Sequence, residues 1–390
     1  MAYIGNYPAE TQTVDFKWQS VQTSAFSAVT GKGYFVNTTS GAITVTLPSS
    51  ANIGDAIAIV DYAGTFATNN ITLTSSLDIE GSTDDKVLTT NREGVTITYA
   101  DATQGWVATS GVNSGDQALD PAPYSIDFLV IAGGGSGGNG SETDRRAGGG
   151  AGGYRTSTQS AEIGTVITVT VGDGGSVLSN GSNSSISGSG LTTITSAGGG
   201  AGGAYGAVGS NGGSGGGGDG GTAGTAPGTT AAGGSGNTPS TSPSQGNNGG
   251  FGEHIAGTYA AGGGGGGAGG VGKDAHATNS DSSDGGVGTA SSITGSSVTR
   301  AGGGGGNHSS AIGGTGGTGG GGDGGNPTGT AGTANTGGGG GSNAAGGKGV
   351  VILSMADADY SGTTTGSPTV ATGVSGKTVL TFTGSGSYTS

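Results

Sequence analysis

The sequence predicts an all-β protein with almost no α-helix, made of a small β-domain followed by a glycine-rich domain. Short runs of alternating apolar and polar residues are typical of half-buried strands. No stretch repeats its apolar residues at the 3.6-residue period of an amphipathic helix. Glycine supplies 98 of the 390 residues, and 81 of these lie between Ile131 and Val350.

Composition divides the chain into five segments. Residues 1–20 are polar with isolated aromatic side chains and cannot bury a core alone, so they are either a frayed terminus or a segment that docks onto another protein. Residues 21–111 form the small β-domain. Residues 112–124 contain two prolines and lose the alternation, which predicts a linker. Residues 125–355 form the glycine-rich bundle domain, and residues 356–390 return to β character.

The β-domain contains six runs with strand-like alternation, separated by turn signals such as Ser40–Gly41. The expected strands are Ala42–Pro48, Ala56–Tyr62, Ile71–Thr74, Lys86–Thr89, Gly94–Tyr99 and Gln104–Ala108.

Two strongly apolar strands, Ser125–Ile131 and Gly349–Ser354, bracket the glycine-rich region. We expect them to pair and to close the domain. The threonine- and isoleucine-rich runs between them predict further short strands. These runs are Thr165–Val171, Leu191–Thr195 and Ser291–Thr294. Near the end of the chain, Lys377–Phe382 and Gly386–Thr389 predict a C-terminal β-hairpin around Gly384.

The glycine-rich region recurs as blocks of similar form joined by loops of variable length. The blocks are Ala147–Tyr154, Ala197–Gly203, Ala261–Gly270 and Ala301–Gly306. Ordering a glycine backbone costs more entropy than ordering any other, and glycine has no side chain to bury. Polyglycine II-type helices offer a solution, because they have three residues per turn and direct every N–H and C=O outward. Hydrogen bonds between such helices would then replace a core, whereas a flexible linker is the competing interpretation.

Other glycine architectures fit poorly. Collagen needs glycine at every third position with abundant proline, but the chain has 9 prolines and runs such as Gly262–Gly267. Calcium-binding β-rolls need a G-G-x-G-x-D motif, and the residues five positions before Asp219 and Asp323 are Ser214 and Thr318. No phosphate-binding loop is followed by a helical pattern.

Composition also excludes several functions. The chain has no cysteine and a net charge of −14, and its basic residues do not cluster, which argues against nucleic-acid binding. No apolar run is long enough to span a membrane, and no signal peptide is visible, so we expect synthesis in a cytoplasm. The closest carboxylate pairs, Asp84 with Asp85 and Asp281 with Asp284, lie in polar turns. We therefore expect no enzyme activity, no cofactor and no metal site.

Several motifs resemble the glycine-rich domain of phage tail-fibre and adhesin proteins. They are Asp127–Gly135, Gly153–Arg155, Ile167–Gly172, Gly181–Ile186 and Gly346–Leu353. The start of the chain, Met1–Asn6, is similar to the N-termini of cyanophage tail-fibre proteins. Thr44–Pro48 with Val60–Gly64 resembles a small β-domain of phage fibres.

This resemblance implies a virion tail fibre, commonly a homotrimer, although some glycine-rich adhesins act as single-chain caps. The N-terminus would dock to other virion proteins, with Tyr3, Ile4, Tyr7 and Trp18 as candidate residues. The loops of the glycine-rich domain would bind a host receptor, either a glycan or an outer-membrane protein.

Aromatic and histidine side chains between the glycine blocks are the candidate receptor-binding residues, since exposed aromatics often anchor binding. They are Tyr205, Phe251, His254, Tyr259, His276 and His308. Two bland interpretations compete: the aromatics cover the sides of the bundle, and the histidines are solvated loop residues. The rival functions are a purely structural virion fibre or decoration protein without receptor contact and an ice-binding bundle, which would need a regular threonine face.

Overall fold

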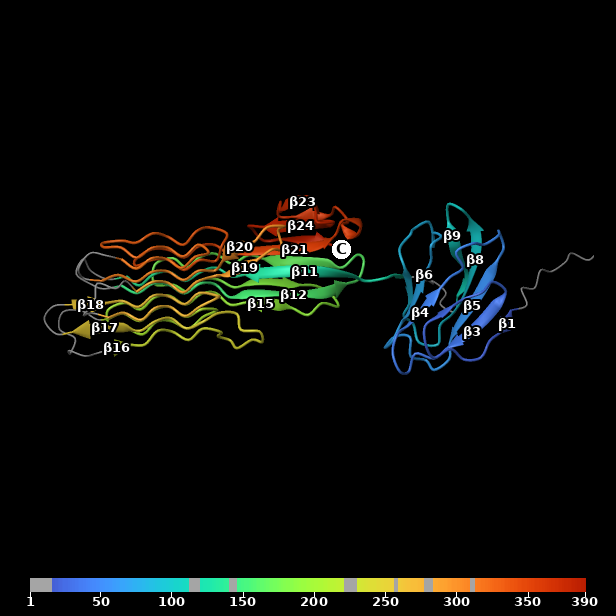
Figure 1. The fold of residues 1–390 in the computed structure, drawn as a ribbon, viewed down its shortest axis with the longest axis horizontal. Helices are drawn as coiled ribbons and strands as arrows, with labels where there is room; N and C mark the ends of the chain where they lie inside the picture. Colours follow the sequence, from blue (N-terminus) through green and yellow to red (C-terminus); the bar gives the residue numbers. More distant parts are fainter. Residues whose placement is uncertain are drawn as a thin grey trace, which may run out of the picture. The chain divides into compact units, whose positions relative to one another are not determined.

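The computed structural model describes residues 16–111, 120–139, 146–220, 230–255, 259–276, 283–308 and 313–390. In these residues the protein is all-β, as predicted, and its helical content is a short 3₁₀ turn, η1 (Asp357–Asp359). The chain divides into two compact units, Met1–Pro123 and Tyr124–Ser390 (Figure 1).

Unit 1 is built from two five-stranded sheets. The first has the order β1-β3-β5-β8-β9, with β1 (Lys17–Trp18), β3 (Lys32–Val36), β5 (Ala56–Asp61), β8 (Gly94–Asp101) and β9 (Gly105–Gly111). The second has the order β10-β7-β6-β4-β2, with β10 (Asp120–Pro121), β7 (Lys86–Leu88), β6 (Ile71–Thr74), β4 (Ile43–Thr46) and β2 (Phe26–Ser27).

The first six strands of unit 1 alternate between the two sheets, so neighbours within each sheet run parallel. Strands β7 to β10 then add antiparallel edges. Alternating residues of both sheets point inward and form one apolar core around Ile59, Leu73, Ile97 and Trp106. Unit 1 is therefore held by side-chain packing.

All six strands expected in this unit are present. Strand β3 is absent from the prediction, although Tyr34 and Val36 alternate as an inward-facing pair and both are buried. The short strands β1, β2 and β10 are absent from it as well. Pro121 is tolerated in β10 because β10 is an edge strand, where a missing N–H need not face a neighbour.

Unit 2 begins with a β-sandwich of two antiparallel five-stranded sheets. One has the order β12-β11-β21-β24-β23, with β12 (Tyr154–Ala161), β11 (Tyr124–Ile131), β21 (Val350–Ala356), β24 (Lys377–Phe382) and β23 (Thr369–Val374). The other has the order β15-β14-β13-β25-β22, with β15 (Ile194–Ser196), β14 (Ser184–Ser187), β13 (Val166–Thr170), β25 (Gly386–Thr389) and β22 (Thr364–Thr365). Phe128, Leu353 and Phe382 pack against Ile167 and Tyr388 between the sheets.

The two strands that bracket the glycine-rich region pair as predicted, since β11 lies antiparallel to β21 with Ile131 opposite Val350. The predicted C-terminal hairpin is wrong in its partners. Strand β24 pairs with β21 and β23, whereas β25 lies in the other sheet between β13 and β22. Gly384 therefore lies where the chain crosses between sheets, and the hairpin is formed by β23 and β24.

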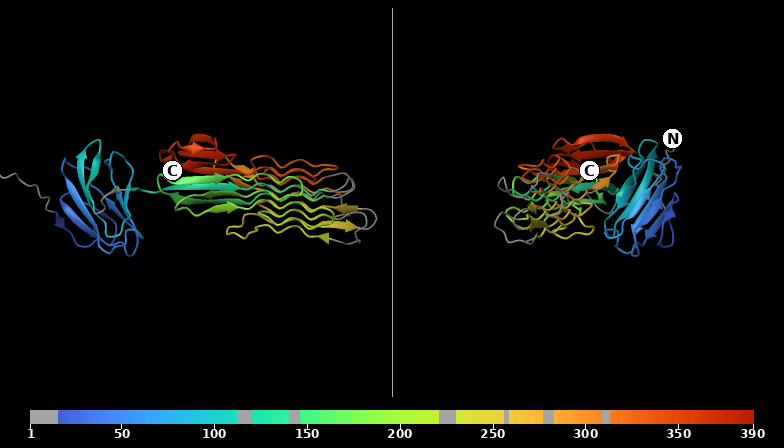
Figure 2. Two further views of the ribbon diagram at one scale, coloured as in Figure 1. Left: turned by 180° about the vertical axis from the view of Figure 1, so that it is seen from behind. Right: turned by 60° about the vertical axis from the view of Figure 1, so that its left-hand side comes forward.

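The glycine-rich segments extend from the ends of the sandwich strands and run side by side as undulating chains (Figure 1, Figure 2). Their hydrogen bonds reveal the conformation. The amides of 148–153 donate to three neighbouring segments in rotation, and every third amide goes to the same neighbour. The donor–acceptor pairs are Gly148–Gly263, Gly149–Gly340, Gly150–Gly200, Ala151–Gly266, Gly152–Gly337 and Gly153–Ala197. This is the bonding pattern of a helix with three residues per turn, as in polyglycine II.

Segment 146–151 also accepts hydrogen bonds from three further segments. The donors are Gly135, Gly138, Ser214, Gly217, Gly304 and Asn307. This central helix therefore has six bonded neighbours, three through its N–H groups and three through its carbonyls. Such close packing explains the glycine: a Cβ on Gly304 would lie 1.9 Å from the Gly340 carbonyl oxygen. The blocks are interpreted correctly as polyglycine II-type helices.

At the edge of the bundle, side chains replace the missing neighbours. The amides of Gly198 and Ala201 donate to the side-chain oxygens of Asn183 and Asn180, again three residues apart. Gln245 Oε1 accepts from the Ala197 N–H at 2.8 Å. Edge amides are thus satisfied without another helix, as buried polar groups require.

Two small sheets complete unit 2. Strands β16 (Thr230–Ala231), β17 (Gly252–Ile255) and β18 (Tyr259–Ala261) form one at the far end of the bundle, and β19 (Thr289–Ser291) with β20 (Val298–Arg300) form a hairpin near the sandwich (Figure 1). The expected strand at Ser291–Thr294 is displaced, because residues beyond Ser291 form the turn of this hairpin.

Candidate binding site at the tip of the glycine-rich bundle

We define the tip as the end of the bundle opposite the β-sandwich of unit 2, where β16–β18 lie (Figure 1). It also includes residues 204–207, 274–276 and 307–308. Backbone contacts tie these segments together. Ala275 N–H donates to the Phe251 carbonyl at 2.9 Å, Asp219 N–H donates to the Ala207 carbonyl at 3.1 Å, and Ala261 forms a β-bridge with His308.

Phe251 and His276 meet at the tip although 24 residues separate them along the chain. Their rings pack edge to face with centroids 5.9 Å apart. His276 Nδ1 lies 3.9 Å from Glu253 Oε2, and the Phe251 N–H donates to Asp274 Oδ1 at 3.0 Å. An aromatic ring, an imidazole and a carboxylate are therefore held together on a β-hairpin and its neighbouring helix.

His254 and His308 take part in the backbone pairing of the tip. His254 lies in β17 opposite Ala260, and His308 is bridged to the adjacent Ala261. Both side chains are buried. The competing interpretation of these two candidate residues as solvated loop histidines is wrong, because strand pairing encloses both.

Tyr205 is an exposed aromatic residue at the tip, with 63% of its surface accessible. It lies in the turn after segment 197–203 with φ of +56°, a conformation that non-glycine residues seldom adopt. Gly206 N–H donates to Asp219 Oδ2 at 3.2 Å and fixes this turn. Tyr259 lies in β18 opposite Ile255, and its side chain falls outside the described residues.

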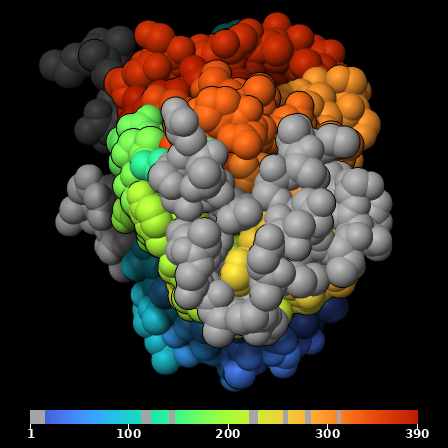
Figure 3. Space-filling model, turned by 90° about the vertical axis from the view of Figure 1, so that its left-hand side faces the viewer, coloured from blue at the N-terminus to red at the C-terminus, as the bar shows by residue number. Residues whose placement is uncertain are grey.

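Figure 3 looks onto the tip and shows surface from the part of the chain that holds β17 and β18. Glu253 was not singled out from the sequence, nor was the pair Lys273–Asp284, whose charged atoms lie 3.8 Å apart. Sequence spacing predicts neither the Glu253–His276 contact nor the Lys273–Asp284 pair, because the residues of each pair come together only when the polyglycine II-type helices pack side by side. Within the described ranges, no three His, Cys, Asp or Glu side chains gather as a metal site.

The candidate docking residues lie in the first unit. Tyr3, Ile4 and Tyr7 fall outside the described residues. Trp18 is 47% exposed in β1 and stacks on Phe35 with ring centroids 4.5 Å apart. Its ring covers Gly33, where a Cβ would lie 2.7 Å from the indole. Trp18 therefore has both a fixed orientation and an accessible face.

The fold defines a class of protein in which a bundle of polyglycine II-type helices is closed at one end by a β-sandwich. A family model described as a glycine-rich domain matches residues 109–356, more than half of the chain. The chain belongs to this glycine-rich domain family. No curated protein matches it. Among the residues that the structure describes, no helix is long and apolar enough to cross a membrane.

Proposed function

We propose that this chain is a structural fibre protein of a bacteriophage and that it attaches to the host surface through the tip. The proposal rests chiefly on one observation: side chains suited to binding, including Tyr205, Phe251 and His276, gather at the end of a bundle whose interior has almost no side chains. Exposed aromatic residues with a fixed backbone are frequent anchors of binding. A bundle held by its backbone can present them without itself contributing to recognition.

In this proposal the receptor is a host glycan or outer-membrane protein, and unit 1 connects the chain to other virion proteins. The sequence resemblance to phage tail-fibre proteins supports a place in the virion tail after synthesis in the host cytoplasm. It also supports a homotrimer. Trp18 is the described residue that best fits virion docking, because its indole face is accessible.

The test is adsorption of the purified full chain to candidate host bacteria, together with competition against phage infection. We expect saturable binding that blocks infection and that falls at least tenfold in a Tyr205→Ala, Phe251→Ala double variant. Ile163→Ala is the matched control, since Ile163 is an exposed apolar residue between β12 and β13, away from the tip.

Folded protein that binds no strain would contradict the attachment role. That result would favour a purely structural virion fibre or decoration protein. Binding that survives the double variant but needs the rest of unit 2 would place the contact elsewhere on the bundle. The fold of each variant is checked by its circular dichroism and thermal transitions.

A further inference from the structure

A cleft of about 430 Å³ lies at the other end of unit 2, on the outer face of the sheet that contains β11 and β12. Its walls come from five parts of the chain: β11, β12, β21, the turn of the β19–β20 hairpin and the β23–β24 hairpin around its turn. The size falls within the range of small-molecule sites. Because the walls are far apart in sequence, the cleft exists only in the folded unit.

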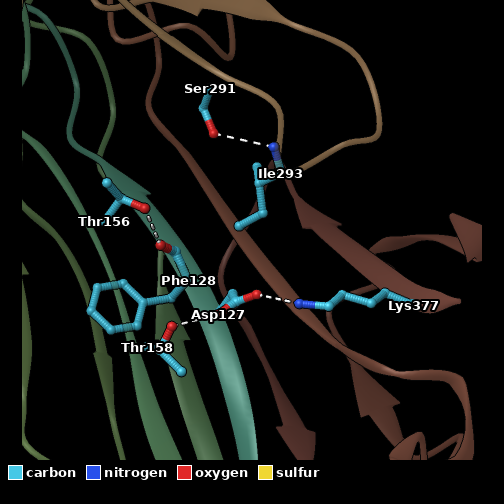
Figure 4. A network of polar contacts seen from close by, with 7 residues as sticks. All are labelled: Asp127, Phe128, Thr156, Thr158, Ser291, Ile293 and Lys377. Carbon is cyan, nitrogen blue, oxygen red and sulfur yellow. Dashed lines mark hydrogen bonds and ion pairs between the residues drawn. The ribbon is translucent and has the colours of Figure 1, made fainter. Parts of the chain in front are cut away.

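The polar side of the cleft is centred on Asp127. Its Oδ2 lies 2.6 Å from Lys377 Nζ, and its Oδ1 accepts a hydrogen bond from Thr158 Oγ1 at 2.5 Å (Figure 4). The side chains of Asp127 and Lys377 are 36% and 47% exposed, so both head groups are accessible from the cleft. Hydrogen bonds from Lys377 and Thr158 hold the pKa of Asp127 below its usual range, which keeps the carboxylate charged at neutral pH.

Unused hydrogen-bonding capacity surrounds this pair. A carboxylate offers about four acceptor positions and a lysine ammonium has three donors, so one contact between them leaves most of both available. The polar residues Thr156, Ser157 and Ser292 also line the cleft. Thr156 Oγ1 donates to the Phe128 carbonyl at 2.8 Å, which leaves its oxygen as an acceptor.

The opposite wall is aliphatic. Ile293 and Val374 line it, and both pack against the smaller apolar cluster of unit 2. Ile293 N–H donates to Ser291 Oγ at 3.2 Å, and Figure 4 shows the Ile293 side chain pointing from the hairpin turn toward β11. Gly295 permits the turn to approach this wall, because a Cβ there would lie 2.7 Å from Val374 Cγ1.

These features select one class of ligand. The charges of Asp127 and Lys377 balance, so an anion would meet the carboxylate and a cation the ammonium. A purely apolar ligand would cover the head groups of Asp127 and Lys377 and displace water from them without offering hydrogen bonds in its place. A ring that carries hydroxyl groups on its edges and C–H groups on its face satisfies both walls at once.

We propose that this cleft is a binding site for an uncharged saccharide of one or two units, separate from the tip. Sugar hydroxyls would donate to Asp127 and accept from Lys377. The C–H face of the sugar ring would lie on Ile293 and Val374. The site goes beyond the attachment function proposed above, because it lies at the sandwich end of the unit and shares no residue with the tip.

The test is titration of the full chain, by calorimetry and saturation-transfer NMR, with glucose, galactose, mannose, N-acetylglucosamine, maltose and lactose. We expect at least one sugar to bind saturably. Asp127→Asn, which keeps the shape but removes the charge, and Thr158→Val, which removes one hydroxyl, are each expected to weaken binding at least tenfold. Ser160→Ala is the matched control, because Ser160 is exposed on the same strand but does not line the cleft.

Saturable binding of none of these sugars would overturn the proposal, as would binding that both variants leave unchanged. Inorganic phosphate and free lysine serve as counter-probes, and saturation by either of them without a sugar would assign the cleft to an ion instead. Each variant is used only if unit 2 unfolds at the same temperature as in the unaltered chain. Failure here leaves the cell-adsorption test of the tip unaffected, since that test uses Tyr205 and Phe251.

Discussion

The two units of this chain offset the entropy cost of folding by opposite means. In unit 1, alternating strands bury side chains such as Leu73 and Ile97 in an apolar core. In the bundle of unit 2, the centre contains backbone, and six neighbouring helices satisfy the N–H and C=O groups of the central one. The comparison teaches that a glycine-rich chain can be ordered where its hydrogen bonds form a closed lattice in three dimensions.

The sharpest way to break this comparison is to add one methyl group to the bundle. Gly304→Ala places a Cβ 1.9 Å from the Gly340 carbonyl oxygen, with backbone on both sides and no side chain able to move. We expect a loss of about 4 kcal/mol or more, since overpacking is combined with lost hydrogen bonds. Calorimetry should show a lower unfolding temperature for unit 2 and an unchanged unfolding temperature for unit 1.

Gly384→Ala is the matched control for this variant. A Cβ on Gly384 would meet no atom within 4 Å, and we expect a change below about 0.5 kcal/mol. Equal, small effects at both glycines would show that the bundle is loose and would contradict the packing described here.

In unit 1 the contribution of core packing to stability is tested by removing buried atoms. Leu73→Ala deletes a fully buried side chain from the core and should destabilise unit 1 by about 2–5 kcal/mol. Chemical denaturation monitored by the fluorescence of Trp106, which lies in that core, measures the loss. We expect the stability of the bundle to stay unchanged, and a comparable fall there would contradict this prediction.

The edge of the bundle should respond less than its centre. Gln245→Met keeps the length of the side chain but removes the acceptor for the Ala197 N–H and the donor to the Pro239 carbonyl. We expect a loss of about 2 kcal/mol, because the buried Ala197 N–H loses its acceptor and the hydrogen bond to the exposed Pro239 is lost as well. Urea denaturation of unit 2 measures it, with Ser244→Ala as a more exposed neighbouring control.

The smallest effect concerns pH and unit 1. Burial raises the pKa of Asp61, but N–H groups of Arg92, Gly64 and Phe66 donate to its carboxylate and lower the pKa overall. This stabilisation is complete above the unfolded value of about 3.9 and is lost as the pH falls toward the folded pKa. Thermal unfolding between pH 5 and pH 2 should show a loss below about 2 kcal/mol. Asp61→Asn should remove that pH dependence.

Sequence reasoning predicted the parts of the fold that depend on local pattern. Period-two alternation located β4 to β9, and the apolar runs at both ends of the glycine region predicted the pairing of β11 with β21. It failed where pairing depends on distant partners. Nothing in Lys377–Phe382 shows that this strand joins β21 and not the following strand, because several registers satisfy the same alternation.

The candidate sites show the same limit. Aromatic and histidine residues between glycine blocks indicated the tip, but burial of His254 and His308 follows from strand pairing that spacing does not reveal. The cleft at Asp127 gave no signal, since its ion-pair partner Lys377 lies 250 residues away. Contacts between side chains that are distant in the sequence can be identified only from the structure.

Amide hydrogen exchange of the segment 148–153, resolved by NMR and compared with the edge strand β12, tests the central claim most directly. Every amide of 148–153 donates to another helix, so we predict that all six exchange slowly and at similar rates. In β12 beyond Tyr154, whose N–H donates to the Gln245 carbonyl, only alternate amides face β11, so slow and fast exchange should alternate there. Exchange of 148–153 at the rate of an unstructured peptide, or in a two-residue alternation, would contradict a bundle held by its backbone.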